Sequence, residues 1–310
     1  MPNTLPQDIT TQDLMSLDYR FNYTDEELVA DYLRLCETNV YKTGSQFKPG
    51  MKLCQHFFPN FFQIQNSKGN SFEKAWQDPI IMDKVREWGL KGMSKLWLSW
   101  VRRAVYMAAG LPNSSFYRPH LARQAIALKG SGRILFDPCA GWGGRLLGTI
   151  SQGWKYIACE PNPETFENLQ RMISFLRKHF DIPPIELSEI QAENYEYAEK
   201  HDIVLTSPPY FDLEVYTKDD QQSYNKFGTY ESWMENWLEP LVNNSLDNLQ
   251  TGGMSCWNVM NFKGHNIVDE IEGMHLNKGY KLHDTLGFKS PLANIRNLKN
   301  KDVTYLFSQD

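Results

Sequence analysis

Four consecutive residues, Ser207-Pro208-Pro209-Tyr210, have the composition of a reacting site and follow the apolar run 203–205. Proline has no N–H donor and fixes φ at about −65°, so Pro208 and Pro209 would hold neighbouring oxygens rigidly. The Ser207 hydroxyl and the Pro208 carbonyl would accept hydrogen bonds, and the ring of Tyr210 could stack on a planar substrate. The alternative is a strand that simply ends in a turn.

A second motif, DPCAGWGG at residues 137–144, also follows an apolar run and precedes a predicted helix. Gly141 and Gly143 would allow positive φ angles and a close approach of the backbone to a ligand. Such a loop alone would also fit NAD or FAD, but the charge of Asp137 would repel a pyrophosphate and suits a ligand with positive charge. No G-K-[ST] follows, which excludes a P-loop.

Acidic residues follow the next two predicted strands. Glu160 comes 19 residues after Gly141, a distance at which a carboxylate can accept both hydroxyls of a ribose. The alternative for Glu160 is an ordinary surface residue. Glu193 and Asn194 follow the third strand and are candidates to meet the edge of an adenine.

Strands and helices alternate from residue 132 onward, which predicts an α/β protein with a mostly parallel sheet. Ligands of such sheets bind at the carboxyl ends of the strands, where both motifs lie. Strands are predicted within 133–140, 155–160, 184–190, 202–207, 254–260, 280–287 and 303–308, and helices within 144–152, 163–180, 230–249 and 266–277.

Residues 1–114 are predicted to form a mainly helical extension, and residues 115–310 the α/β domain. Thr24 is expected to cap a short helix that follows it. A helical pattern is predicted from about Asp83 to Ala109, with Gly110 as its stop. Its apolar spacing predicts that Trp97 and Trp100 face the core rather than stack on bases.

The charge is distributed unevenly. Residues 34–130 contain 15 basic and five acidic side chains, whereas the whole chain has a net charge of −5. This basic block predicts a surface that faces phosphates, with an ordinary solvated surface as the alternative.

Composition also indicates a compartment. The five cysteines are scattered and form no C-x-x-C pair, and the seven histidines include no H-x-x-x-H, so neither a disulfide framework nor a metal site is expected. The chain has no apolar run of about 18 residues and no secretion signal at its start. We therefore expect a cytoplasmic protein.

Together these motifs resemble the amino-group DNA methyltransferases of the class I S-adenosylmethionine-dependent superfamily. The resemblance covers residues 115–310. DPCAGWGG resembles the cofactor loop, Glu160 the ribose-binding acid, SPPY the [DNS]-P-P-[YFW] catalytic motif, and FYRPHLARQAI at 116–126 the segment that closes over the methionine end of the cofactor. The style of AGWG-R and SPPYFDLE is similar to that of phage and viral orphan methyltransferases, and this resemblance implies the cytosol of a bacterium or of a phage-infected host.

The resemblance implies a Rossmann-like methyltransferase fold, with a mostly parallel seven-stranded sheet and helices on both faces. It implies S-adenosylmethionine as cofactor and double-stranded DNA with a flipped base as partner, in DNA methylation of the restriction–modification kind. The implied catalytic residues are Ser207, Pro208, Pro209 and Tyr210, and the implied cofactor-binding residues are Tyr117, Pro119, Asp137, Pro138, Ala140, Gly141, Gly143, Glu160, Glu193 and Ser207. Trp142 and Arg145 are bulkier than the usual residues of this loop, which predicts a narrower pocket.

Several alternatives stay open. Ser207 at the head of its motif favours cytosine N4 over adenine N6 without excluding adenine. The same fold and motif would also serve an RNA base. A catalytically silent nucleic-acid-binding subunit of a heterodimer would usually lack either the cofactor acid or the catalytic motif, and both are present. Cytosine C5 chemistry is disfavoured because Cys139 lies inside the cofactor loop. Residues 211–230 are predicted to form a mobile flap over the substrate.

Overall fold

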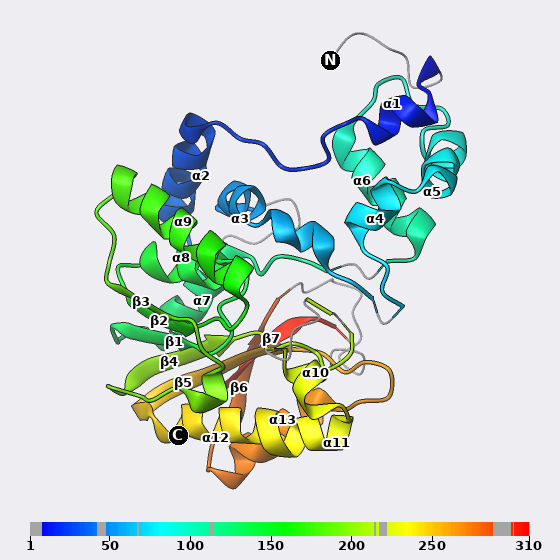
Figure 1. Ribbon diagram of the computed structural model, residues 1–310. Coiled ribbons are helices and arrows are strands. Elements are labelled where there is room, and N and C mark those ends of the chain that lie inside the picture. Colours follow the sequence, from blue (N-terminus) through cyan, green and yellow to red (C-terminus); the bar gives the residue numbers. More distant parts are fainter. Residues whose placement is uncertain are drawn as a thin grey trace. The chain divides into compact units, whose positions relative to one another are not determined.

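A computed structural model describes residues 8–41, 48–66, 68–111, 114–213, 215–216, 222–287, 299 and 301–309 of the chain. The chain forms two compact units, which are coloured along the sequence in Figure 1. The first unit consists of Met1–Asn22, Pro59–Ser115 and Asp212–Lys218, and the second of Tyr23–Phe58, Phe116–Phe211 and Asp219–Asp310.

The second unit is built around a seven-stranded sheet with the order β3-β2-β1-β4-β5-β7-β6 (Figure 1). Strand β7 is antiparallel to both of its neighbours, and the other neighbouring pairs are parallel. This sheet confirms the predicted α/β class and the predicted number of strands. The strands are β1 (Ile134–Asp137), β2 (Lys155–Cys159), β3 (Ile185–Ser188), β4 (His201–Thr206), β5 (Leu249–Val259), β6 (Lys281–Leu286) and β7 (Val303–Ser308).

Helices cover both faces of this sheet. Figure 1 shows α7 (Pro119–Lys129), α8 (Gly144–Ile150) and α9 (Pro163–His179) on one face, and α11 (Tyr230–Trp233), α12 (Glu239–Asp247) and α13 (Ile267–Asn277) on the other. Three shorter helical segments complete this part of the unit: η4 (Ala192–Asn194), α10 (Ser223–Phe227) and η5 (Met234–Leu238).

Two helices of the predicted N-terminal extension belong to the unit that contains the sheet. They are α2 (Asp25–Glu37), which Thr24 caps as predicted, and α3 (Met51–Phe57). The Asp31 carboxylate of α2 accepts a hydrogen bond of 2.7 Å from the Lys52 N–H of α3. The ring of Phe57 then packs 5.5 Å from that of Phe175 on α9. Residues 23–58 therefore pack with the sheet unit, which differs from the predicted boundary after residue 114.

Arg123 shows that the basic block at 34–130 is not one continuous solvent-facing surface. Its side chain is buried, and its guanidinium donates hydrogen bonds to the carbonyl oxygens of Leu35, Cys36 and Thr38 where α2 ends. Carbonyls at a helix end lack partners within the helix, so a buried arginine stabilises this end of α2. Arg123 is therefore unsuited to bind a phosphate.

The first unit has an aromatic core, in which Trp76, Phe72, Phe62 and Tyr19 pack with ring centroids 4.8–5.6 Å apart. Its helices other than α6 have only five or six residues. The helices of this unit are α1 (Thr11–Met15), η2 (Pro59–Gln63), α4 (Phe72–Trp76), α5 (Pro79–Lys84), the π-helical η3 (Val85–Gly89) and α6 (Leu98–Ala109).

The helical pattern predicted from Asp83 to Ala109 is divided among α5, η3 and α6, and residues 90–97 form no helix. Helix α6 ends at Gly110 as predicted, with a φ of 59° there. It buries Val101, Ala104 and Val105. Trp97 and Trp100 are 56% and 38% exposed, so the prediction that both face the core is wrong. Trp97 precedes α6 as its N-cap residue, with an extended backbone, so helical spacing does not determine its direction.

Within the described part of the chain, none of the helices has both the length and the apolar character that a membrane span requires. The five cysteines are free thiols.

Candidate active site

The loop between β1 and α8 begins at Asp137 and contains the glycines expected to approach a ligand. Gly141 and Gly143 have φ angles of 57° and 73°, in the region that favours glycine. A Cβ atom on Gly144 would lie 2.0 Å from the carbonyl oxygen of Tyr117, so only glycine lets this helix start so close to the neighbouring segment. The three glycines therefore serve the turn itself and the packing of the loop.

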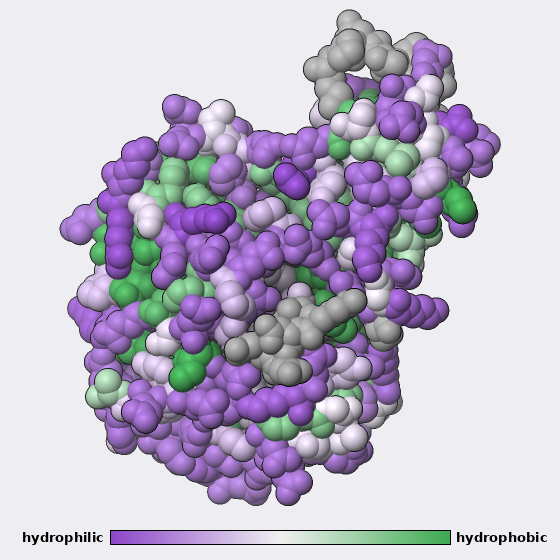
Figure 2. All heavy atoms as spheres, in the orientation of Figure 1, coloured by the Kyte–Doolittle hydropathy of each residue, from purple (hydrophilic) through white to green (hydrophobic). Residues whose placement is uncertain are grey.

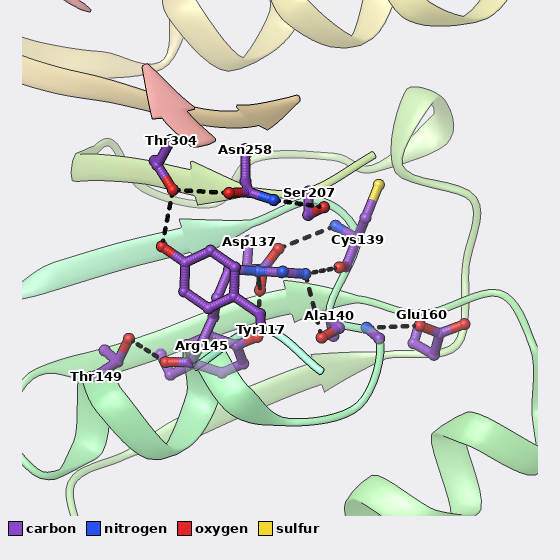
Figure 3. A network of polar contacts seen from close by, with 12 residues as sticks. Tyr117, Asp137, Cys139, Ala140, Arg145, Thr149, Glu160, Ser207, Asn258 and Thr304 are labelled. Carbon is purple, nitrogen blue, oxygen red and sulfur yellow. Dashed lines mark hydrogen bonds and ion pairs between the residues drawn. The ribbon is translucent and has the colours of Figure 1, made fainter. Parts of the chain in front are cut away.

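Asp137 and Arg145 form a buried ion pair beneath this loop (Figure 3). The Arg145 Nε atom lies 2.7 Å from Asp137 Oδ2, which also accepts a hydrogen bond of 2.7 Å from the Tyr156 hydroxyl. The other carboxylate oxygen of Asp137 accepts from the Cys139 N–H at 3.2 Å. The side chain of Asp137 is fully buried, and that of Arg145 is 5% exposed. The charge of Asp137 is therefore neutralised by Arg145 inside the protein. This corrects the expectation that Asp137 faces a positively charged ligand.

Arg145 also binds the backbone of the loop. Its Nη2 atom donates to the carbonyl oxygens of Cys139 and Ala140, the latter at 3.3 Å. Its guanidinium lies 5.2 Å from the centre of the Tyr117 ring. The side chain turns inward under the loop in Figure 3, so the prediction that its bulk narrows the pocket is wrong. One arginine instead ties the loop to the segment that precedes α7.

Glu160 follows β2 directly, at the same edge of the sheet as the loop. Its Oε2 atom accepts a hydrogen bond of 2.9 Å from the Gly141 N–H, and its Oε1 atom accepts one of 3.0 Å from the Asn162 N–H. Burial raises the pKa of Glu160 to about 7, although these two N–H groups oppose the shift. The carboxylate is therefore fixed in direction and ionises close to neutral pH.

Glu193 lies in η4, after β3. Its carboxylate accepts hydrogen bonds from Lys226 Nζ and Trp237 Nε1, both at 3.1 Å. These partners come from helical segments well beyond β4 in the sequence, α10 and η5. Asn194, the other candidate for an adenine edge, is exposed.

The SPPY motif begins where β4 ends, and the sheet register determines its neighbour. Thr206 is paired with Trp257 of β5, so the residues that follow them, Ser207 and Asn258, lie side by side. The Asn258 Nδ2 atom is 3.5 Å from Ser207 Oγ. Asn258 thus presents an N–H group to the predicted catalytic hydroxyl.

Tyr210 is held through its hydroxyl. It donates hydrogen bonds to Asp302 Oδ1 at 2.8 Å and to the carbonyl oxygen of Asn258 at 3.2 Å. The Asn258 Nδ2 atom binds the same Asp302 oxygen. Asn258 and Asp302 together fix both ends of the motif, Ser207 and Tyr210.

A chain of hydrogen bonds extends this arrangement to the segment before α7 (Figure 3). Thr304 stands opposite Asn258 in the β5–β7 register, and its hydroxyl lies 3.0 Å from Asn258 Oδ1. The Tyr117 hydroxyl lies 3.1 Å from the Thr304 hydroxyl. The catalytic and cofactor-binding segments predicted from sequence are therefore linked through side chains of β5 and β7.

Sequence reasoning missed Asn258, Asp302 and Thr304. The only signal was a polar side chain within or beside two otherwise apolar strands, MSCWNVM and VTYLF. Their contacts join residues 44 to 187 positions apart, which no local pattern reveals.

The remaining predicted site residues occupy backbone positions around these side chains. Pro119 is the first residue of α7 and is buried, and Pro138 is buried directly after β1. The Ala140 N–H donates to the carbonyl oxygen of Cys159 at 2.9 Å, which joins the loop to β2. Pro208 is buried and Pro209 is partly exposed.

The predicted flap at 211–230 is structured where it is described. Phe211 is buried at a φ of 37°, with its ring 5.1–5.9 Å from four aromatic rings, those of Tyr224, Tyr230, Trp233 and His265. Ser223 begins α10 and accepts a hydrogen bond of 3.0 Å from Trp233 Nε1. Residues 222–230 therefore form helix and cap rather than a connecting loop, and residues 214 and 217–221 of the flap lie outside the described residues.

No protein-family model and no curated protein sequence matches this chain. Among solved structures, the chain is similar to the glycopeptide N-methyltransferase MtfA, with 13% identity, a TM-score of 0.40, and coverage of 60% of this chain and 93% of that one. It is similar to a methyltransferase from Pyrococcus furiosus, with 18% identity, a TM-score of 0.41, and coverage of 67% and 93%. It is also similar to the T. thermophilus 16S rRNA N2 G1207 methyltransferase RsmC in complex with AdoMet and guanosine, with 15% identity, a TM-score of 0.40, and coverage of 64% and 44%.

The strand order decides the fold. Five parallel strands are followed at one edge by β7, which inserts antiparallel between β5 and β6. With helices on both faces of this sheet, the second unit of the chain has a Rossmann-like α/β fold.

Proposed function

We propose that this protein transfers a methyl group from S-adenosylmethionine to the exocyclic amino group of a base in DNA, cytosine N4 or adenine N6. The observation that carries the proposal is the fixation of Ser207 and Tyr210 by one residue, Asn258, at the carboxyl end of β4. The loop after β1 and Glu160 after β2 lie at the same edge of the sheet, where ligands of parallel sheets bind.

The side chains present suit the proposed cofactor. The Glu160 carboxylate is held by two N–H groups and keeps further lone pairs for the two hydroxyls of a ribose. A Cβ atom on Gly141 would lie no nearer than 3.8 Å to a neighbouring atom, an ordinary van der Waals contact, so the requirement for glycine there comes from its positive φ. S-adenosylmethionine would supply an electrophilic methyl group bound to a positively charged sulfur.

Ser207 would prepare the amino group for the reaction. The nitrogen of an exocyclic amine is a poor nucleophile because its lone pair is delocalised into the ring. A hydrogen bond from that amine to Ser207 Oγ would draw the nitrogen toward sp³ geometry and free the lone pair. The Asn258 N–H beside Ser207 would keep the hydroxyl oxygen directed at the substrate.

Tyr210 would position the base. Its hydroxyl is held by Asp302 and by Asn258, so its ring has little freedom to turn away from a stacked base. A base flipped out of a duplex and stacked on one aromatic ring gains about 1–3 kcal/mol. No covalent intermediate with the protein is required.

Incubation with S-adenosylmethionine labelled in its methyl group, followed by digestion of the nucleic acid, tests this proposal. Label is expected in N4-methylcytosine or N6-methyladenine of unmodified DNA. Label found solely in a parallel RNA incubation would assign the protein to RNA bases. Cofactor binding without label in either nucleic acid would contradict the proposal.

Ser207→Ala is expected to lower turnover by about 100-fold, the usual cost of removing one positioned hydrogen-bonding group at a reacting centre. The dissociation constant for S-adenosylmethionine, measured by calorimetry, should stay within about twofold because Ser207 acts on the substrate. Asn258→Ala should also lower turnover, since Ser207 loses the Asn258 Nδ2 donor, and Asp302, which holds the Tyr210 hydroxyl, loses the same donor.

Thr285→Ala is a matched control for these variants. Thr285 lies in β6, the edge strand of the same sheet, where it is paired with Tyr305 of β7. Two strands, β5 and β7, separate β6 from β4. Loss of cofactor binding by Ser207→Ala, with folding intact, would show that Ser207 has another role.

A further inference from the structure

The first unit presents an unusual set of exposed side chains along α6. Trp97 is the N-cap residue of α6, and Trp100, Arg103 and Met107 follow it in the helix at spacings that place these three on one side. These four residues are called here the tryptophan stripe. Trp97 is 56% exposed, Trp100 is 38% exposed and Met107 is 58% exposed. On the face shown in Figure 2 most of the surface is hydrophilic, with hydrophobic side chains scattered over it.

Packing within the unit does not explain the stripe. The residues with which α6 meets its core are Val101, Ala104 and Val105, all at most 1% exposed. Trp100 is anchored, because its Nε1 atom donates to the carbonyl oxygen of Gly89. Large apolar side chains that stay in water while a different face satisfies the core usually mark a binding surface.

Cations accompany both tryptophans. The Lys95 Nζ atom lies 4.7 Å from the ring centre of Trp97, and the Arg103 guanidinium lies 5.5 Å from that of Trp100. The sequence has no acidic residue between Glu87 and Asp137. Since the stripe combines flat aromatic faces with positive charge, it suits a partner that combines flat rings with negative charge.

We propose that the tryptophan stripe binds the unpaired bases of a single-stranded nucleic acid. The indoles of Trp97 and Trp100 would stack on successive bases, while Lys95 and Arg103 would contact the phosphates between them. Bases inside a duplex have no free face to stack on, so the stripe selects unpaired or melted strands. The inference rests on the proposed function for the choice of a nucleic acid over another anionic partner.

Fluorescence anisotropy of a labelled dodecathymidylate, titrated with the full chain and its variants, tests this proposal. Trp97→Ala is expected to weaken binding about tenfold, as for the loss of one stacked base. Trp97→Phe should retain most of the affinity, because it keeps an aromatic face. Tyr41→Ala is the matched control, since Tyr41 is an exposed aromatic residue (68%) of the second unit and should leave binding unchanged.

The basic residues should behave differently from the aromatic ones. Lys95→Gln combined with Arg103→Gln should weaken binding and flatten the dependence of affinity on salt, measured from about 50 mM to about 200 mM. Trp97→Ala should leave that salt dependence unchanged. A duplex of the same length should bind less tightly than the single strand, and oligouridylate compared with the thymidylate identifies the preferred sugar.

Two outcomes would overturn the proposal. One is equal binding of the single strand by Trp97→Ala and the unaltered chain. The other is a dimer in sedimentation that dissociates in Trp97→Ala, because the stripe would then be covered by a second copy. A methyl-transfer assay separates the two proposals. If the chain binds the single strand through Trp97 but transfers no methyl group, the proposal for the tryptophan stripe stands and the proposed function is wrong.

Discussion

Arg145→Met is expected to lower the free energy of unfolding by about 3–5 kcal/mol, the usual cost of breaking a buried ion pair by removing one partner. The reason is Asp137, whose carboxylate is fully buried and would keep only the Tyr156 hydroxyl and the Cys139 N–H as donors. Burial of an unpaired charge is more costly than the loss of the contact itself. Urea unfolding followed by circular dichroism measures the change.

Two further variants distinguish the effect of the buried Asp137 charge from the effect of the contacts that Arg145 makes with the loop after β1. Arg171→Met removes an arginine whose side chain is 68% exposed and lies 3.6 Å from the Glu167 carboxylate, and it should cost less than about 1 kcal/mol. Asp137→Asn combined with Arg145→Met should recover part of the lost stability, because no unpaired charge remains.

The double variant should nevertheless bind S-adenosylmethionine poorly. Arg145 also donates to the carbonyl oxygens of Cys139 and Ala140, and neither substitution restores these contacts. If the single Arg145→Met variant unfolded at the same urea concentration as the unaltered chain, the ion pair would have no structural role.

The affinity for S-adenosylmethionine is expected to rise about tenfold between about pH 6 and about pH 8. Glu160 has a pKa of about 7 because it is buried, so it is mostly protonated at the lower pH. A ribose hydroxyl donates a hydrogen bond to the ionised carboxylate, so the bound state favours ionisation and binding strengthens as the proton leaves. Calorimetry in buffers of matched ionic strength measures this profile.

Glu160→Gln is the matched control for the pH profile. It keeps the shape of the side chain and cannot ionise, so any pH dependence that it retains comes from the amino group of the cofactor. As the pH falls through about 7, the affinity of the unaltered chain for S-adenosylmethionine should fall more steeply than that of Glu160→Gln. Parallel profiles for the two proteins would remove Glu160 from the cofactor site.

The same group predicts the opposite trend for stability. The pKa of Glu160 in the folded chain is above its usual value of 4.5, so the folded state binds this proton more tightly than the unfolded state does. The contribution of Glu160 to stability is therefore fully present below about pH 4.5 and is lost as the pH rises through about 7. Glu160→Gln should be relatively more stable than the unaltered chain at the upper end of this range.

The sequence predicted the sheet well because strand periodicity and turn residues are local signals. All seven predicted strands are present, although β5 begins at Leu249 and includes residues predicted as a turn, and α2 begins after the Thr24 cap. The predicted cofactor loop and the SPPY motif fall at strand ends because the run of apolar residues stops there. Because ligands of parallel sheets bind at the carboxyl ends of the strands, the order of strands and motifs along the chain was enough to predict the binding edge.

Burial and domain boundaries were predicted less well. The spacing along α6 identified Val101 and Val105 as core residues but placed Trp97 and Trp100 with them. Periodicity reveals that a helix has an apolar side, and it does not reveal which of two apolar sides finds a partner. Residues 23–58 joined the sheet unit through contacts with α9, more than 100 residues later in the chain.

The sequence by itself thus determined the fold class, the order of the strands along the chain and the two motifs at their carboxyl ends. The tertiary structure alone decided which side chains serve those motifs: Arg145 neutralises Asp137, and Asn258 and Asp302 hold Ser207 and Tyr210. The physical reason is the range of the interactions. Strand and helix preferences act between near neighbours, whereas a buried charge or a hydroxyl takes its partner from whichever strand the folded sheet places beside it.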